Sequence, residues 1–314
     1  MLLDGSGGCL EYPFEQVADW RAERGCLWLH FDFEDAEVQD WLEHHSGLND
    51  VAFHALVSPE TRPRAVNRGD NLLLTLRGIN LTPGADPDDM VSLRIWTDGN
   101  RVISTRRRSL LSTQDVREEL DAGNGPCNAT ELLVAWVDRI TWRMSETVEN
   151  FDDQVLALEE RVLNEEIAGV RLELARLRKQ TLSIRRYLAP QREAMNRLVN
   201  ENITWLDDMN RLRLREVNDR LIRHIEDIDE ARERAAMAQE ELLSRVSEQM
   251  NRRSYVFTVV ATIFLPLGFF TGLMGINVGG MPGVEDADAF WVVVAICIGV
   301  IAVLAVLFRW KRWL

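Results

Sequence analysis

Two long apolar stretches lie near the C-terminal end of the chain, from Tyr255 to Met274 and from Phe290 to Phe308. Neither contains an acidic or basic residue. As a helix, each is long enough to cross a hydrocarbon core of roughly 30 Å. A helix buried in a water-soluble protein can be equally apolar, but two in tandem favour two transmembrane helices joined by a loop over 275–289.

The charges that flank these stretches predict their orientation. Arg252 and Arg253 precede the first stretch, Arg309, Lys311 and Arg312 follow the second, and the loop between them has no Lys or Arg. By the positive-inside rule, both termini lie in the cytoplasm and the loop lies outside. We therefore expect a multi-pass protein of the cytoplasmic (inner) membrane.

Before residue 128 the pattern is that of a mixed α/β domain. Buried strands are predicted over 26–33 and 71–81, and two alternating arms around Asp98-Gly99 predict a hairpin. Helical spacing marks 35–45 and 109–123. Short strands mixed with helices indicate a compact domain over 1–127.

Long helices follow this domain. Asn128 and Glu131 resemble a capping box, which predicts that a helix begins there. Gly169 should separate it from a second helix over 171–200, which Pro190 should kink or break. A third helix is predicted from Asp207 into the first apolar stretch. The chain is thus predicted to be α+β, with a stalk over 128–253 and a transmembrane domain over 254–314.

The third helix carries apolar residues at alternating spacings of three and four, as in a coiled coil. They are Leu214, Val217, Leu221, Ile225, Ile228, Ala231, Ala235, Ala238, Leu242 and Val246. This stripe can pack against the two preceding helices of the same chain, or against other copies around an axis. Both hold if different faces of the helix are used.

One face of the first membrane stretch is predicted to line a pore. Two helices cannot enclose a water-filled path, so conduction would require several copies. The face collects small and polar residues together with two large apolar ones: Asn251, Ser254, Phe257, Thr258, Ala261, Leu265, Gly268 and Gly272. Tight helix packing selects similar residues, so the pattern also fits a non-conducting anchor.

Composition narrows the function further. The formal net charge of −14 suits cations and argues against nucleic acid, which needs a basic surface. The four cysteines form no C-x-x-C pair, so neither a disulfide framework nor a thiolate zinc cage is expected. No Walker A, H-E-x-x-H or G-x-S-x-G motif is present, and we expect no enzyme.

The tripeptide Gly275-Ile276-Asn277, at the outer end of the first of two C-terminal stretches, resembles that of the CorA-type divalent metal-ion transporters. The surrounding "TGLMGINVGGMPG", together with "PETRPR" (59–64) and "RRYLAPQR" (185–192), is more similar to the ZntB branch. The sequence departs from magnesium-selective CorA proteins, which usually read Y-G-M-N and then M-P-E: Met274 stands at the Tyr position and Gly283 at the Glu position.

This resemblance implies a homopentamer in the lipid bilayer. The long helices would form a cytoplasmic funnel, and Gly275, Ile276 and Asn277 would form a selectivity filter at the external mouth. The implied cargo is Zn²⁺. The alternative within the family is a CorA-like Mg²⁺ or Co²⁺ channel, and the alternative outside it is a membrane-tethered sensor that conducts nothing.

The filter and the loop each have a simpler structural explanation. Gly275, Gly279 and Gly280 can serve a turn that needs positive φ, and Asn277 is also a common turn residue. With the architecture, we favour a ring of Asn277 carboxamides that holds a hydrated cation. The loop acids Glu285, Asp286 and Asp288 would raise the local cation concentration.

No tightly bound cofactor is expected, and no resident metal site is assigned. Asp40 and His44 stand four residues apart on a predicted helix, but ordinary histidines are the more common outcome. Proton coupling is associated with the ZntB branch. The membrane stretches contain no carboxylate or His that could act as a relay, so the sequence leaves coupling and the direction of transport open.

Overall fold

The computed structural model describes the chain except for residues 60–61, 83, 87, 165–168, 276–287 and 311–314. It contains two compact units, Met1–Glu241 and Leu242–Leu314. The domain boundaries expected at 127 and 253 stay predictions. The fold is α+β, with a sheet domain, long helices and two candidate transmembrane helices.

A mixed sheet with the order β2-β1-β3-β7-β6-β5-β4 forms the base of the first unit. Only β3 and β7 pair in parallel among the described strands. The strands are β1 (Leu2–Leu3), β2 (Cys9–Leu10), β3 (Leu27–Asp32), β4 (Arg64–Arg68), β5 (Asn71–Gly78), β6 (Val91–Thr97) and β7 (Arg101–Arg106).

The predicted strands and hairpin are confirmed, with one shorter than expected. Strand β3 falls inside 26–33, and β6 and β7 form the hairpin. Its turn is closed by Asp98, whose Oδ1 accepts hydrogen bonds from the backbone N–H groups of Asn100 and Arg101, while Gly99 has a φ of 90°. Strand β5 ends at Gly78 instead of residue 81. The Asn80 side chain there accepts from the Thr82 N–H and turns the backbone away from the sheet.

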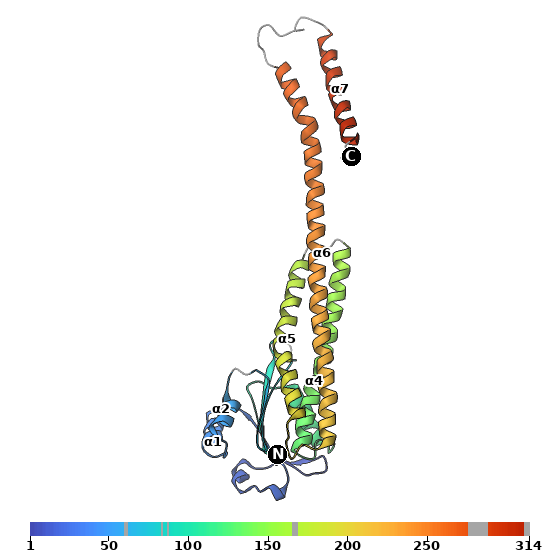
Figure 1. Ribbon diagram of the computed structural model, residues 1–314. Coiled ribbons are helices and arrows are strands. Elements are labelled where there is room, and N and C mark those ends of the chain that lie inside the picture. The colour runs from blue at the N-terminus through green and yellow to red at the C-terminus, as the bar shows by residue number, and fades with distance from the viewer. Residues whose placement is uncertain (60–61, 83, 87, 165–168, 276–287, 311–314) are drawn as a thin grey trace. The chain divides into compact units, whose positions relative to one another are not determined.

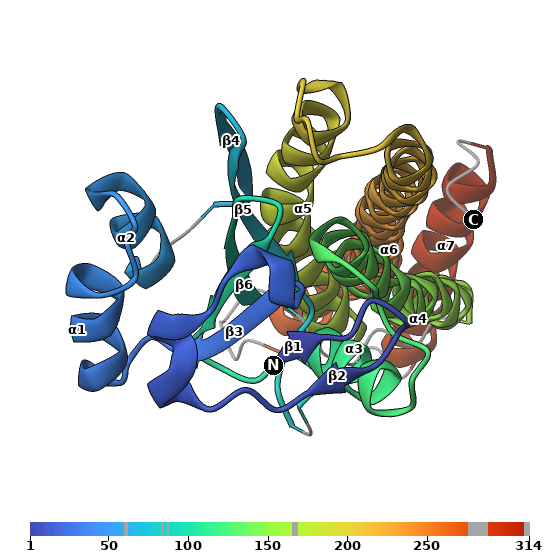
Figure 2. The ribbon, with the colours of Figure 1, turned by 90° about the horizontal axis from the view of Figure 1, so that it is seen from below.

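Helices cover both faces of the sheet (Figure 2). One face packs against α1 (Ala36–His44) and α2 (Asp50–Val57), where Leu27, Leu56 and Ile103 belong to a buried core. The other face packs against α4 (Ala129–Leu163) and α5 (Val170–Asn200), with α3 (Leu111–Asp121) against α4. The helices predicted over 35–45 and 109–123 correspond to α1 and α3.

Three long helices run side by side in this unit (Figures 1 and 2). They are α4 (Ala129–Leu163), α5 (Val170–Asn200) and the first part of α6 (Asp208–Met274). The predicted cap is confirmed: Asn128 Oδ1 accepts from the Glu131 N–H at 2.9 Å. Gly169, at a φ of 82°, separates α4 from α5. Pro190 lies inside α5 without ending it.

The apolar stripe of α6 serves packing within the chain. Its positions from Leu214 to Ala238 are all buried. Ion pairs flank the stripe: Arg220 contacts Asp138 of α4 at 3.1 Å, and Asp229 contacts Arg185 of α5 at 2.5 Å. The intramolecular interpretation is therefore confirmed, and self-association through another face stays a prediction.

Candidate membrane pathway

Both predicted apolar stretches are helical, within α6 and within α7 (Ala289–Trp310). Each contains a long window with few charges that is not buried against protein. In water such a surface would be strongly unfavourable, and in a bilayer it faces lipid or a neighbouring helix. Length, composition and exposure together indicate a membrane protein.

The predicted pore face of α6 is uncovered in the single chain. All of its predicted residues, from Asn251 and Ser254 through Thr258, Ala261, Gly268 and Gly272, are exposed. The two large apolar members, Phe257 and Leu265, are 76% and 74% exposed. Because the chain itself does not cover this face, it is open to lipid, to water or to further copies.

The three threonine hydroxyls in the apolar stretch of α6 are satisfied by the helix itself. Thr258 donates to the Ser254 carbonyl at 2.8 Å, and Thr262 and Thr271, which the sequence analysis did not select, donate to the Thr258 and Leu267 carbonyls. Such back-bonding lets a hydroxyl lie in an apolar medium without an unpaired donor. Thr262 and Thr271 could have been selected from the sequence, because each is a polar residue within an apolar stretch.

The helix glycines leave room for close approach from outside the chain. A Cβ atom added at Gly268 or Gly272 would meet no atom within 4 Å. Gly275 corrects one expectation, because its φ is not positive. Its N–H donates to the Thr271 and Gly272 carbonyls, so Gly275 itself continues the hydrogen bonding of the last helical turn and is not in the left-handed conformation.

The segment predicted to form an outer mouth is described only in part. Gly275 and Asp288 are placed, whereas Ile276, Asn277, Gly279, Gly280, Glu285 and Asp286 lie outside the described residues. The Asp288 carbonyl accepts hydrogen bonds from the N–H groups of Trp291 and Val292, so this acid stands at the start of α7. A carboxylate there also stabilises the helix dipole, which gives Asp288 a structural role besides the predicted one.

The described residues hold no group of three or more His, Cys, Asp or Glu side chains arranged for a metal ion. Asp40 and His44 lie 3.2 Å apart on α1, and both are largely exposed to solvent. All four cysteines are free. Burial raises the pKa of the Cys26 thiol to about 12, so it stays protonated and is a poor metal ligand.

Residues 23–312 match the family model described as "CorA-like Mg2+ transporter protein". The chain is 39% identical over its whole length to "Divalent cation transporter CmaX" of Pseudomonas aeruginosa, covering 95% of it. It is 38% identical over 92% of its length to "Zinc transport protein ZntB" of Yersinia enterocolitica, covering 87% of that protein.

A solved structure is similar to this chain over nearly its whole length. The "structure of the full-length CmaX protein" aligns with a TM-score of 0.88 at 38% identity, covering 99% of this chain and 96% of that one. The shared fold therefore includes the sheet domain, the long helices and both apolar helices.

Proposed function

The chain belongs to the family of CorA-like Mg²⁺ transporter proteins, and from this premise we propose that it carries Zn²⁺ across the cytoplasmic membrane through a central pore lined by α6. The general function, without regard to which ion is carried, is transport of divalent cations. The observation that carries the proposal is the uncovered small and polar face of α6 in a chain that is 38% identical to a zinc transport protein.

The pore requires several copies of the chain. Each copy supplies two apolar helices, which cannot surround water. The exposed Gly268 and Gly272 allow α6 helices to approach one another closely, and Phe257 and Leu265 would form apolar constrictions that gate by dewetting. A homopentamer with both termini in the cytoplasm is the assembly that the family resemblance implies.

The proposed filter is the ring of Gly275-Ile276-Asn277 tripeptides at the outer mouth. An Asn carboxamide can hydrogen-bond the water around a cation, and the tripeptide has no carboxylate or thiolate to replace that water. Zinc would then pass hydrated, with modest selectivity. Glu285, Asp286 and Asp288 would concentrate cations outside the mouth.

Replacement of the filter amide tests this proposal. In proteoliposomes with a zinc-sensitive dye inside, Asn277→Ala should lower zinc influx about tenfold or more, since one hydrogen-bonding group is lost from every copy. Asn200→Ala, at the exposed end of α5, is the matched control. Unchanged zinc influx in Asn277→Ala would contradict a role of Asn277 in the filter. A purified protein that is monomeric would contradict the proposed pore, which needs several copies.

A second candidate cargo is Mg²⁺ or Co²⁺, because the matching family description names Mg²⁺ and CmaX is described only as a divalent cation transporter. The departures from the magnesium-selective pattern at Met274 and Gly283 favour zinc.

A further inference from the structure

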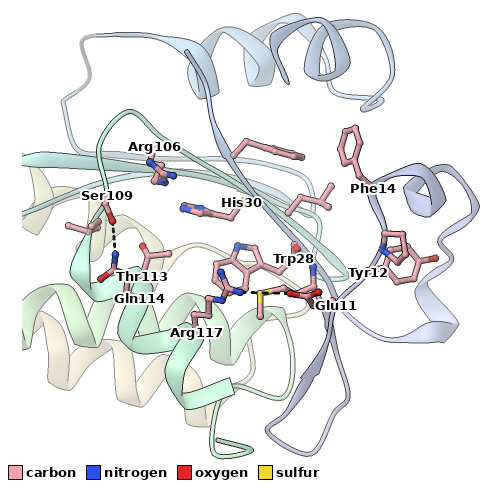
Figure 3. Close-up of a pocket in the computed structure, with 15 residues that line it drawn as sticks. Glu11, Tyr12, Phe14, Trp28, His30, Arg106, Ser109, Thr113, Gln114 and Arg117 are labelled. Atoms are coloured by element: carbon pink, nitrogen blue, oxygen red, sulfur yellow. Dashed lines mark hydrogen bonds and ion pairs between the residues drawn. The ribbon is translucent and has the colours of Figure 1, made fainter. Parts of the chain in front are cut away.

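A cavity in the sheet domain is not used by any part of the proposed transport. It has a volume of about 540 Å³, within the range of roughly 300–1,000 Å³ usual for small-molecule sites. Its walls come from the segment around Tyr12, from β3, from the end of β7 and from α3 (Figure 3). The cavity therefore lies entirely within the first compact unit.

Two arginines at this cavity have unused hydrogen-bond donors. Among the described residues, the Arg106 side chain approaches only Asp32, at 3.4 Å. The Arg117 side chain approaches Glu11 and Asp121 at 3.9 Å, which is beyond hydrogen-bond distance. Elsewhere in the same unit, arginines such as Arg143 form short double contacts with one carboxylate. The planar guanidinium groups at the cavity are thus available to an oxyanion.

A histidine lines the same cavity. His30 Nδ1 lies 2.8 Å from Ser104 Oγ, which also accepts from Trp28 Nε1 and lies 3.3 Å from the Leu29 carbonyl. If the serine proton goes to Leu29, the histidine donates from Nδ1 and its Nε2 is left as an acceptor. Among the described residues Nε2 has no partner. Burial, together with Arg106, lowers the pKa of His30 to about 4, so the ring is neutral at pH 7.

Further polar and apolar groups complete the site. Thr113 is buried at the cavity wall, and its hydroxyl has no hydrogen-bond partner in the described part of the chain. Aromatic rings supply the apolar walls: Tyr12, Phe14, Trp28 and Phe31. Flat rings favour a flat apolar ligand. Glu11 is the one carboxylate among the described lining residues, and it is 93% exposed, so solvent screens its charge.

We propose that this cavity binds a small aromatic anion. Arg106 and Arg117 would hold a carboxylate or phosphate group, His30 Nε2 would accept a hydrogen bond from a hydroxyl of the ligand, and the aromatic walls would contact its ring. The site is independent of the membrane helices, and its existence does not depend on which cation is transported.

Titration calorimetry on the full-length protein in detergent tests this site. The probes are 4-hydroxybenzoate, phenyl phosphate and the neutral 4-hydroxybenzamide. We expect at least one anion to bind saturably and at least tenfold more tightly than the amide, and the better anion identifies the preferred oxyanion. Arg117→Gln should weaken that binding about tenfold or more, as expected for a lost charged hydrogen bond.

Arg68→Gln is the matched control, because Arg68 is exposed on β4 and losing it removes the same charge away from the cavity. Arg106→Gln provides a second test, with its melting temperature measured to establish that it folds. The proposal would be overturned if neither anion bound, or if anion and amide bound equally well. It would also be overturned if Arg117→Gln and folded Arg106→Gln left binding unchanged, or if Arg68→Gln weakened binding as much as they do.

Discussion

Trp136 connects the long helices to the sheet, and its replacement should destabilise the first unit strongly. It is fully buried on α4, and its ring packs edge-on against Trp28 of β3 with the ring centroids 5.3 Å apart. Trp136→Ala removes this contact and leaves a cavity, a change that typically costs about 3–5 kcal/mol. The indole N–H has no partner among the described residues, so both replacements also remove an unpaired buried donor. This offset places the loss for Trp136→Ala toward the lower end of the range, whereas Trp136→Phe in addition keeps most of the ring contact.

Thermal unfolding of the full-length protein in detergent, followed by circular dichroism at a fixed scan rate, measures the effect. For a unit of this size, 3–5 kcal/mol corresponds to a fall in Tm of roughly 6–20 °C. Trp142→Ala on the same helix is the control, because Trp142 is 54% exposed and should lose only about 1 kcal/mol. Trp136→Phe should remain much closer to the wild type. An equal fall in Tm for Trp136→Ala and Trp142→Ala would refute this account of the interface.

Two further predictions concern the same unit. Ala235→Leu, at a fully buried position of the α6 stripe, should overpack the bundle by about 1–3 kcal/mol and lower the Tm, whereas Met237→Leu on the exposed side should not. Because the pKa of His30 is about 4 when folded and 6.5 when unfolded, its neutral form stabilises the fold fully above pH 6.5, and about 3 kcal/mol is lost as the pH falls to 4. His30→Gln should therefore flatten the fall in Tm over this window relative to the exposed control His54→Gln, and an unchanged slope would contradict it.

The parts of the fold with strong periodicity could be predicted from the sequence. The run at 26–33 is mostly apolar, as expected for a strand with helices on both faces. The long helices show a sustained helical pattern and contain two prolines, Pro190 and Pro266, neither of which ends its helix. Strands β1 and β2 are too short to show a period, and β4 is polar because it lies at the edge of the sheet. Helix α2 is mainly apolar throughout, so it has no clear amphipathic pattern.

The sites differ in how far the sequence could predict them. The face of α6 follows from helical spacing, and its role in lining a pore stays a prediction, because most residues of this stretch are exposed in the single chain. The cavity at His30 was not predicted, since Arg106, Arg117 and His30 come from three separated segments that only the sheet and α3 bring together. At Gly275 the sequence suggested a residue with positive φ, whereas its φ is not positive and its N–H donates two backbone hydrogen bonds. A glycine after a helix is compatible with both conformations, so the residue pattern alone does not distinguish them.

Metal flux into proteoliposomes tests the central claim most directly, with Zn²⁺ compared with Mg²⁺ in the presence and absence of an imposed pH gradient. The account predicts zinc influx well above that of magnesium, and a response to the gradient would support proton coupling as in the ZntB branch. Magnesium flux driven by voltage alone would contradict the assignment of zinc and favour a CorA-like channel. No flux of either ion through a correctly inserted oligomer would contradict transport itself and favour a membrane-tethered sensor.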